Sequence, residues 1–424
     1  MKFRVITLGC KVNTYESEAI KQLLILEGYE YTREENADIV IINTCSVTSQ
    51  SDVKCRHAIK REIKHNNGAI IVVMGCYAQM ANQVISNIEG VSIIVGTNMR
   101  HKIPKLIEEY KEQKVQINLV EDKIRHSEYE TLSVTSYSDN TRAFVKIQDG
   151  CDNFCSYCII PYARGRMRSR KKEDVLNEIS GLVNQGYKEI VLTGIHTAGY
   201  GRDFSDYRFD DLLEDILKIP NLARLRISSI EESEISKRLI SLMSNNSHLA
   251  NHLHIPLQSG CDSVLKRMNR KYNCEEFYEK ISMLYDMIPN LSITTDIIVG
   301  FPGESDEEFL TTYEFAKKCK FAKIHVFPFS PRSGTPASRM SNQIDPKIKK
   351  SRVHQMLELS KELEENYSNK FIGLPLETIF EEFDENTSMY KGHSSNYLEV
   401  YYQSDEDIRG KMLNVEYKKL DSVK

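Results

Sequence analysis

Over its first 110 residues the chain alternates between short apolar runs and longer stretches with helical spacing. Three runs rich in valine and isoleucine have the length of β-strands: residues 3–8, 37–43 and 69–74. Residues 13–28 and 51–66 repeat apolar positions at helical intervals, and Gly28 and Gly68 mark the expected helix ends. Such a strand–helix series predicts a doubly wound parallel sheet with helices on both faces.

A second strand–helix series follows, and its strands recur at intervals of roughly 30–45 residues. Its six apolar runs are residues 143–148, 189–194, 224–229, 253–258, 292–300 and 323–330. Six units predict a partial (β/α)6 barrel, because the full barrel has eight. After residue 366, short alternating strands with glycine turns predict a small β-barrel. The expected domains are therefore residues 1–120, 142–365 and 366–424, with a polar linker at 121–141.

Composition narrows the class of protein. The chain has 424 residues, of which 41% are hydrophobic and 27% charged, and no apolar run has the length of a membrane span. The only apolar stretch near the start, Val5 to Leu8, is too short for a secretion signal. We expect a cytoplasmic protein without a membrane partner. In a reducing compartment we expect the ten cysteines to be metal ligands, reactive thiols or buried apolar residues rather than members of disulfides.

Three cysteines follow the three N-terminal strands directly, and we call them the N-terminal triad: Cys10, Cys45 and Cys76. The carboxyl ends of parallel strands meet at one edge of a sheet, so these thiols are expected to lie together. A buried cysteine can also be a small apolar residue. Three equivalent positions favour shared metal ligation.

Three further cysteines follow the first strand of the second series, and we call them the loop triad: Cys151, Cys155 and Cys158. Their spacing is C-x3-C-x2-C, and no further Cys or His occurs in the next thirty residues. A zinc ribbon would need a second cysteine pair. Iron–sulfur clusters are held by thiolates, and a four-iron cluster with three of them leaves one iron open to a small molecule.

This pattern resembles the radical S-adenosylmethionine (SAM) superfamily. The preceding spaced cysteines, and a C-terminal module that resembles a TRAM domain through residues 392–400, are similar to the methylthiotransferases. The resemblance covers essentially the whole chain. It implies that the loop triad holds a 4Fe-4S cluster that binds SAM, whose reductive cleavage gives a radical that abstracts hydrogen. The N-terminal triad is implied to hold a second 4Fe-4S cluster that carries the sulfur to be methylated.

The same resemblance implies a SAM site at the strand ends, formed by Thr193, Gly194, Ser228, Ser229, Glu231 and Gly300. For Ser228, Ser229 and Glu231 the alternative is ordinary capping of strand ends. This chain departs from many relatives, because Thr193–Gly194 stands where they carry a glycine pair and a glutamate.

Residues 8–18, 192–201 and 224–231 resemble the branch that acts on threonylcarbamoyladenosine in tRNA. The implied activity adds a methylthio group to C2 of this base at position 37, in the anticodon loop. His196 and Thr197 are candidates for binding the threonylcarbamoyl group, or are simply structural loop residues.

The segment 164–172 supports an RNA partner, although the net charge of the chain is −4. Its six cationic residues are Arg164, Arg166, Arg168, Arg170, Lys171 and Lys172. They are expected to face phosphates, the alternative being a solvated surface. The C-terminal module is acidic and does not resemble a strongly cationic RNA clamp. An electron donor such as flavodoxin or ferredoxin and a sulfur source are further implied partners.

Other functions stay open on the sequence. A tRNA isopentenyladenosine methylthiotransferase would keep the chemistry and change the substrate. A radical enzyme with a non-RNA product would use the first domain as a redox relay. A metal-stabilised, non-catalytic RNA-binding protein would hold metal without SAM cleavage.

Overall fold

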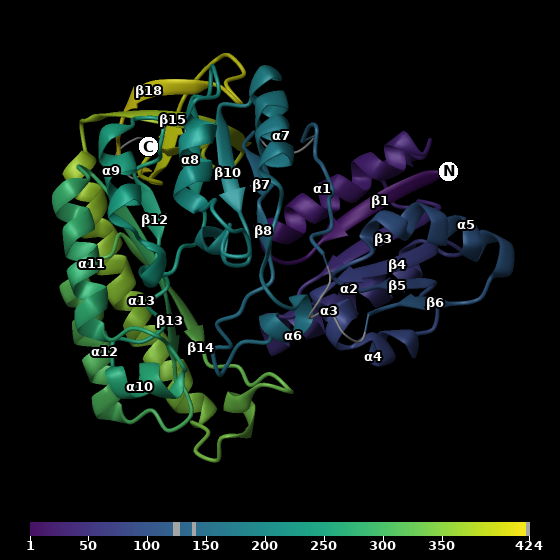
Figure 1. Ribbon diagram of the computed structural model, residues 1–424, viewed down its shortest axis with the longest axis horizontal. Coiled ribbons are helices and arrows are strands. Elements are labelled where there is room, and N and C mark those ends of the chain that lie inside the picture. The colour runs from purple at the N-terminus through teal and green to yellow at the C-terminus, as the bar shows by residue number, and fades with distance from the viewer. Residues whose placement is uncertain (122–127, 138–140, 421–424) are drawn as a thin grey trace. The chain divides into compact units, whose positions relative to one another are not determined.

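The computed structural model describes residues 1–121, 128–137 and 141–420 (Figure 1). The chain forms two compact units. Unit 1 consists of Met1–Thr135, Lys146–Lys171 and Ser330–Ser338, and unit 2 of Ser136–Val145, Lys172–Phe329 and Arg339–Lys424. The loop triad therefore belongs to the same unit as the N-terminal triad, although the family resemblance assigns the two to different domains.

Unit 1 is built on a six-stranded sheet with the order β2-β1-β3-β4-β5-β6, and all neighbouring strands are parallel. Its strands are β1 (Lys2–Thr7), β2 (Glu30–Tyr31), β3 (Ile39–Thr44), β4 (Ile70–Gly75), β5 (Ile93–Val95) and β6 (Ile117–Leu119). The three longest are those expected from the apolar runs. The other three have only two or three residues each, too few to form a recognisable pattern.

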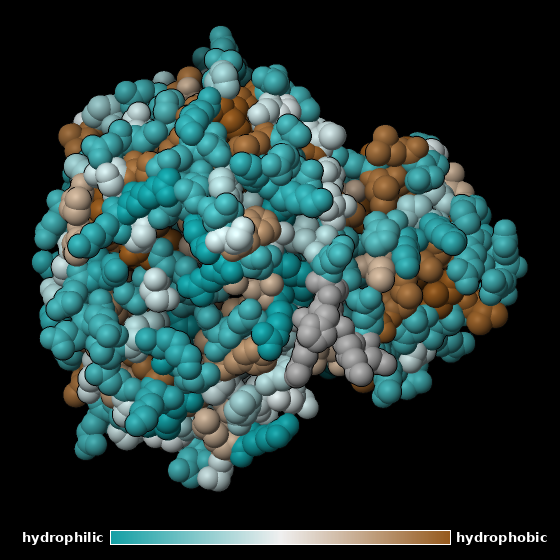
Figure 2. All heavy atoms as spheres, in the orientation of Figure 1, coloured by the Kyte–Doolittle hydropathy of each residue, from teal (hydrophilic) through white to brown (hydrophobic). Residues whose placement is uncertain are grey.

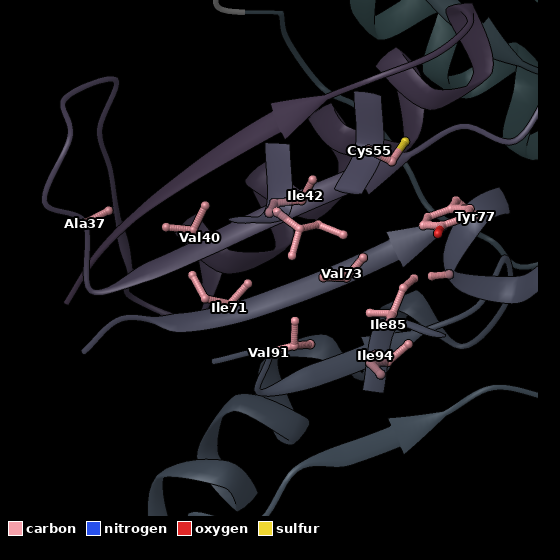
Figure 3. Close-up of a cluster of buried hydrophobic side chains, with 12 residues drawn as sticks. Ala37, Val40, Ile42, Cys55, Ile71, Val73, Tyr77, Ile85, Val91 and Ile94 are labelled. Carbon is pink, nitrogen blue, oxygen red and sulfur yellow. The ribbon is translucent and has the colours of Figure 1, made fainter. Parts of the chain in front are cut away.

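Five helices connect these strands: α1 (Lys11–Leu26), α2 (Ser49–His65), α3 (Cys76–Met80), α4 (Asn82–Ser86) and, after the short turn η1 (Arg100–Lys102), α5 (Ile103–Gln113). Alternate residues of the central strands, such as Val40 and Ile42 of β3, form a core beneath α2, α3 and α4 (Figure 3). Cys55 of α2 lies in this core and packs there as a small apolar residue. Both faces of β3, β4 and β5 are buried.

A short ribbon completes unit 1 and carries the loop triad. Strands β8 (Gln148–Asp149) and β9 (Arg168–Ser169) pair antiparallel, and α6 (Ile160–Arg164) lies between them in sequence. The segment 330–338 also belongs to this unit, where Arg332 Nη2 lies 2.7 Å from Asp52 Oδ2 at the start of α2.

Unit 2 contains the second strand–helix series. Two three-stranded sheets have the orders β11-β10-β7 and β12-β13-β14. Their strands are β7 (Ala143–Lys146), β10 (Glu189–Thr193), β11 (Arg224–Ile227), β12 (His252–His254), β13 (Ser292–Val299) and β14 (Lys323–Pro328). Parallel bridges from Leu225 to Leu249 and from Ser229 to His254 connect the two sheets, so the six strands follow one another in chain order. Parallel sheets in an α/β architecture are confirmed.

The helices of unit 2 alternate with these strands, as the sequence pattern predicts. They are α7 (Lys172–Asn184), η3 (Thr197–Gly199), α8 (Phe209–Leu217), η4 (Glu232–Glu234), α9 (Lys237–Asn245), α10 (Asp262–Arg267), α11 (Cys274–Met287), α12 (Asp306–Cys319), η5 (Pro336–Arg339, shared with unit 1), α13 (Pro346–Ser368) and η6 (Asn369–Phe371). Capping boxes at Asn273 and Ser305 fix the starts of α11 and α12.

The C-terminal residues form a four-stranded antiparallel sheet with the order β17-β16-β15-β18. Its strands are β15 (Pro375–Asp384), β16 (Met389–Ser394), β17 (Glu399–Tyr402) and β18 (Met412–Glu416). A core that includes Phe380 and Val400 packs it on the end of α13 through Tyr367 and on η6 through Phe371. The expected all-β character of this part of the chain is confirmed.

A buried ion cluster joins the C-terminal sheet to β10 and β11 within unit 2. Glu189 Oε1 lies 2.7 Å from Arg226 Nε and 3.6 Å from Arg142 Nη1, while its Oε2 lies 3.1 Å from Arg224 Nη1. Burial would raise the pKa of Glu189, but the arginines, Arg226 foremost, lower it to about 2. Tyr397 stacks nearby, with its ring 4.8 Å from the Arg226 guanidinium.

The predicted linker, residues 121–141, falls partly on 122–127 and 138–140, which lie outside the described residues. Its described stretch 128–137 forms no helix or strand; residues 128–135 belong to unit 1 and residues 136–137 to unit 2. Val134 is buried, and Glu130 Oε2 accepts a hydrogen bond of 2.8 Å from Arg100 Nε.

The surface is mostly polar. Figure 2 shows hydrophilic side chains over most of the visible face, with hydrophobic ones in scattered groups. Among the helices that the structure describes, none has both the length and the apolar character needed to cross a membrane.

Candidate functional site

The structure brings the N-terminal triad together at one edge of the unit 1 sheet. Cys10 caps the start of α1, Cys45 follows β3, and Cys76 is the first residue of α3 directly after β4. Cys10 is exposed, whereas Cys45 and Cys76 are buried. The thiols are near enough for Cys10 and Cys45 each to raise the pKa of Cys76. The juxtaposition expected from the strand-end rule is therefore present.

A glycine is required for Cys76 to reach this edge. Gly75 has a φ of +100°, and a Cβ there would lie 2.5 Å from Asn43 Oδ1 and 2.6 Å from the Thr44 carbonyl oxygen. Any other residue would therefore clash with the end of β3. The close approach lets β4 pass directly into α3, which places Cys76 at the helix start.

Asn13 of α1 holds two segments of this edge in place. Its Nδ2 donates to the carbonyl oxygens of Leu8 and Thr44 and to Asn43 Oδ1, each at 3.1 Å. Its Oδ1 accepts from Cys10 Sγ at 3.3 Å. One buried amide thus fixes both the Cys10 loop and the end of β3. The sequence analysis did not single it out.

The loop triad lies between β8 and α6. Cys155 is buried, and Cys151 and Cys158 are half-buried. The loop folds back on itself, because the Cys158 amide donates to the Cys155 carbonyl at 3.0 Å and the Asn153 amide lies 3.5 Å from Cys151 Sγ. At its base the Cys151 amide donates to the Gly165 carbonyl at 3.1 Å.

Gly150 allows this base to close. Its φ is +75°, and a Cβ there would lie 2.0 Å from the Arg166 carbonyl oxygen. No larger residue fits between the two chain segments. The approach keeps the start of the loop beside the residues that precede β9.

Burial makes two thiols of the N-terminal triad, those of Cys76 and Cys45, less acidic. It raises the pKa of the Cys76 thiol to about 12, while Arg164 acts in the opposite direction. It also raises the pKa of Cys45. Metal ligation displaces such protons, because only the thiolate is a ligand. No disulfide joins any of the ten cysteines, all of which lie in the described part of the chain.

A buried ion network lies beside both triads. Glu16 Oε1 is 2.8 Å from Arg164 Nη1, 2.8 Å from Lys146 Nζ and 2.5 Å from Arg100 Nη1. Lys146 Nζ is also 2.6 Å from Asp149 Oδ2. Burial alone would raise the pKa values of Glu16 and Asp149, but these cations hold both carboxyl groups well below their usual range. Both carboxylates are therefore charged in the interior.

The structure corrects half of the predicted RNA-binding set. Arg164, Arg168 and Arg170 are buried and face partners inside unit 1. Arg168 Nη1 donates to the Arg164 carbonyl at 2.7 Å, and Arg170 Nη1 lies 3.0 Å from Tyr15 Oη. These three side chains do not face solvent, because they are buried against partners within unit 1. The remaining members are Arg166 and Lys171, which are exposed, and Lys172, which is half-buried.

The predicted SAM-binding residues lie at strand ends of unit 2. Thr193 ends β10 and Gly194 follows it, while Ser228 and Ser229 follow β11. Ser228 is buried, and its Oγ has no hydrogen-bond partner among the residues that the structure describes. Buried hydroxyls normally have a partner, so this one is available to a bound polar group.

The two other members of this set have protein neighbours. Glu231 forms an ion pair with Arg270. The space beside the Cα of Gly300 is taken by Lys349, whose Cγ would lie 2.4 Å from a Cβ on the glycine. The absence of a side chain at Gly300 therefore makes room for Lys349 of α13.

His196 and Thr197 lie together after β10, and both are buried. His196 Nε2 is 3.1 Å from Glu234 Oε1, which favours the structural alternative for this histidine. Thr197 Oγ1 has no hydrogen-bond partner in residues 1–121, 128–137 and 141–420. It is thus a second buried hydroxyl available to a ligand, after that of Ser228.

Comparison with known proteins decides the family. Residues 2–96 match the Uncharacterized protein family UPF0004, and residues 145–316 match the Radical SAM superfamily. The chain is 47% identical to the threonylcarbamoyladenosine tRNA methylthiotransferase MtaB of Bacillus subtilis (strain 168), over 96% of this chain and 92% of the relative. It is 36% identical to the tRNA-2-methylthio-N(6)-dimethylallyladenosine synthase of Thermoanaerobacter sp. (strain X514), over 97% and 89%. The chain belongs to the radical SAM methylthiotransferase family.

Solved structures agree on the fold of this methylthiotransferase. The radical S-adenosylmethionine methyltransferase TsrM of Kitasatospora setae superposes with a TM-score of 0.58 at 13% identity, covering 80% of this chain and 73% of TsrM. The cobalamin-dependent radical enzyme OxsB gives a TM-score of 0.54 at 12% identity, over 85% and 56%. At these identities the likeness concerns the fold alone.

The residues present fit the groups that the family uses. Each triad offers three thiols, the donor that iron–sulfur clusters take. In the parts of the chain that the structure covers, no three His, Cys, Asp or Glu side chains are placed so that together they could hold one metal ion. A four-iron cluster does not need such a point, because its thiolates bind different irons. The buried hydroxyls of Ser228 and Thr197 fit a polar cofactor.

The sequence analysis missed the residues that support the two triads in the methylthiotransferase. They are Asn13, Glu16, Lys146 and Asp149, and each has at least one partner that is distant in sequence or on another element. In the sequence, the only feature that pointed to these residues was their short distance from a cysteine, as with Asp149, two residues before Cys151.

Proposed function

We propose that this methylthiotransferase adds a methylthio group to C2 of N6-threonylcarbamoyladenosine at position 37 of tRNA, by a radical SAM mechanism. The observation that carries the proposal is the 47% identity over nearly the whole chain to an enzyme named for this substrate. Relatives named for dimethylallyladenosine are 33–36% identical. The sequence motifs after Leu8, Leu192 and Arg224 favour the same branch.

Within this proposal the loop triad holds the cluster that binds SAM, and the N-terminal triad holds a second cluster. When bound, these groups supply the electron, the radical and the sulfur. The protein's contribution is to bring six thiols into unit 1 and to exclude water from Cys45, Cys76 and Cys155, which are buried. Exclusion of water protects a reactive radical from side reactions.

We further propose that Thr193, Gly194, Ser228, Ser229, Glu231 and Gly300 contribute to SAM binding, and that Thr197 contacts the substrate. Support comes from the strand-end positions of the first four and from the buried hydroxyls of Ser228 and Thr197. His196 acts through Glu234 in this arrangement, by holding the loop that carries Thr197.

The tRNA contact is proposed at Arg166, Lys171 and Lys172, the members of the basic segment that are not buried. An adenosine in a single-stranded loop can be turned out for modification at little cost. An electron donor such as flavodoxin or ferredoxin and a sulfur source complete the proposed partners. The domain organisation proposed is a doubly wound sheet, a partial (β/α)6 barrel of radical SAM type and a TRAM-like barrel.

The test is an anaerobic reaction with reconstituted protein, SAM carrying a deuterated methyl group, a reductant and tRNA from a strain that lacks both adenosine methylthiotransferases. Nucleoside mass spectrometry should find the labelled methylthio group on threonylcarbamoyladenosine. Label on isopentenyladenosine alone would retain the chemistry and overturn the substrate. Formation of 5′-deoxyadenosine without any labelled nucleoside would overturn tRNA as the substrate, and zinc in place of iron would leave only a non-catalytic protein.

A further inference from the structure

Arg164 touches the N-terminal triad directly, although it belongs to the segment that carries the loop triad. It ends α6 and is fully buried. Its Nε donates a hydrogen bond to Cys76 Sγ at 3.3 Å. The two residues are 88 positions apart, so only the fold brings them together.

The other edge of the same guanidinium is fixed by two carboxylates. Nη1 lies 2.8 Å from Glu16 Oε1 and 3.1 Å from Asp149 Oδ1, and Nη2 lies 3.2 Å from Glu16 Oε2. A planar guanidinium with both edges engaged has one orientation, so its Nε–H is held toward the sulfur.

The charge of the buried network suits a thiolate at Cys76. Seven charged side chains form it: Glu16, Glu130, Asp149, Arg100, Lys146, Arg164 and Arg168. Three are negative and four are positive, so the part of this network that the structure describes has an excess of one positive charge. The Cys76 sulfur beside Arg164 is where a negative charge would balance it.

The same residues anchor the loop triad at both of its ends. Asp149 precedes the loop, and its Oδ1 accepts from the Gly150 amide at 2.8 Å. Arg164 follows the loop, and the carbonyl of its neighbour Ala163 accepts from Thr97 Oγ1 at 2.6 Å. The loop is thus closed onto the sheet edge that carries the N-terminal triad, all within unit 1.

We propose that Arg164 is a positioning residue shared by the two triads: its Nε–H holds the Cys76 thiolate, while its Nη groups hold the base of the loop triad. The inference rests on the proposed role of Cys76 as a cluster ligand. A hydrogen bond from a cation to a ligand sulfur stabilises the reduced, more negative cluster and raises its reduction potential. Arg164 thereby makes the N-terminal cluster easier to reduce and fixes its place relative to the loop.

The test uses the full chain with the loop triad changed to alanine, so that only the N-terminal cluster is present. In this background R164K keeps the charge and removes the Nε–H that reaches Cys76. R100K is the matched control, because Arg100 is an equally buried arginine that contacts the carboxylates of Glu16 and Glu130. The readouts are iron content and an EPR-monitored redox titration.

We expect R164K to reduce the equilibrium constant for reduction at least tenfold, which is 59 mV for a one-electron couple. R100K should leave the potential unchanged. Equal potentials in R164K and its parent would overturn the role of Arg164 while keeping the cluster proposal. A parent without iron would overturn both.

A second measurement needs no substitution at Arg164. In the parent protein, electron–nuclear double resonance of the reduced cluster should detect an exchangeable proton that is lost on transfer to deuterium oxide. The absence of such a proton would contradict the hydrogen bond from Arg164 Nε to Cys76.

Discussion

Replacing Gly150 by alanine should open the loop that carries Cys151, because the new methyl group has no room. Its position would be 2.0 Å from the Arg166 carbonyl oxygen and 2.7 Å from the Gly165 carbonyl oxygen. The loop and the segment before β9 would have to separate. We therefore expect the substitution to act on the loop triad and to spare the N-terminal triad.

The magnitude follows from two costs. An L-residue at the φ of +75° found here costs about 1–2 kcal/mol. Separation of the segments also removes the hydrogen bond from the Cys151 amide to Gly165, worth about 1 kcal/mol. Together they amount to about 2–3 kcal/mol, or a fall of about 30- to 150-fold in the closed form of the loop.

The assay is iron content after anaerobic reconstitution, together with the rate of 5′-deoxyadenosine formation. Iron should fall from about eight toward about four atoms per chain, with at least a tenfold loss of SAM cleavage. Gly186→Ala is the matched control: its φ is +98°, and no described atom outside its immediate neighbours lies within 4 Å of the new Cβ. Full iron content and an unchanged cleavage rate in Gly150→Ala would show that the loop accommodates the methyl group without opening.

Four further predictions concern other parts of the molecule. Cys45→Ala should halve the iron and abolish methylthio transfer while SAM cleavage continues; retained transfer, measured by nucleoside mass spectrometry, would exclude it as a ligand. Glu189→Gln leaves buried arginines without their counter-charge and should lower the free energy of unfolding by about 3–5 kcal/mol, as measured by urea denaturation. An unchanged denaturation midpoint would contradict the ion cluster. Because the folded-state pKa of Glu189 is lowered to about 2, its contribution is complete above about pH 4.5 and is lost as the pH falls toward 2. Arg166→Ala and Lys171→Ala should each reduce the slope of log affinity for tRNA against log salt by about 1, and unchanged slopes would place the RNA elsewhere. Ser228→Ala should weaken SAM binding about fivefold to tenfold in calorimetry without loss of stability, since its hydroxyl has no partner among the described residues; equal affinity would remove it from the SAM site.

The strands and the cysteines could be predicted because their signals are local. Runs such as residues 39–44 and 70–75 are apolar throughout, and a cysteine placed just after such a run must lie at the carboxyl edge of the sheet. The same rule explains why the N-terminal triad could be found from residues far apart in sequence.

The arginines of the basic segment could not be assigned from the sequence, because their partners lie elsewhere in the chain. Arg164 pairs with Glu16, which is 148 residues away, and Arg170 contacts Tyr15, which is 155 residues away. A run of cations looks the same whether it faces solvent or buried carboxylates. Only the fold shows that Arg166 is exposed while its neighbours are not.

The division into units was also beyond the sequence. The loop triad follows β8, which comes soon after β7 in the chain; β7 pairs in unit 2, yet the residues from Lys146 to Lys171 belong to unit 1. Within unit 1, Glu16 pairs with Lys146 and Arg164, which lie more than a hundred residues away and share no motif with it.

The central claim is that this enzyme methylthiolates threonylcarbamoyladenosine in preference to isopentenyladenosine. The most direct test is a competition in one anaerobic reaction, with equal amounts of a tRNA carrying each base and limiting enzyme. The initial rates of methylthio incorporation into the two nucleosides are then compared by mass spectrometry. We expect incorporation into threonylcarbamoyladenosine to be at least a hundredfold faster, which corresponds to about 2.7 kcal/mol of discrimination. Equal rates, or faster incorporation into isopentenyladenosine, would contradict it.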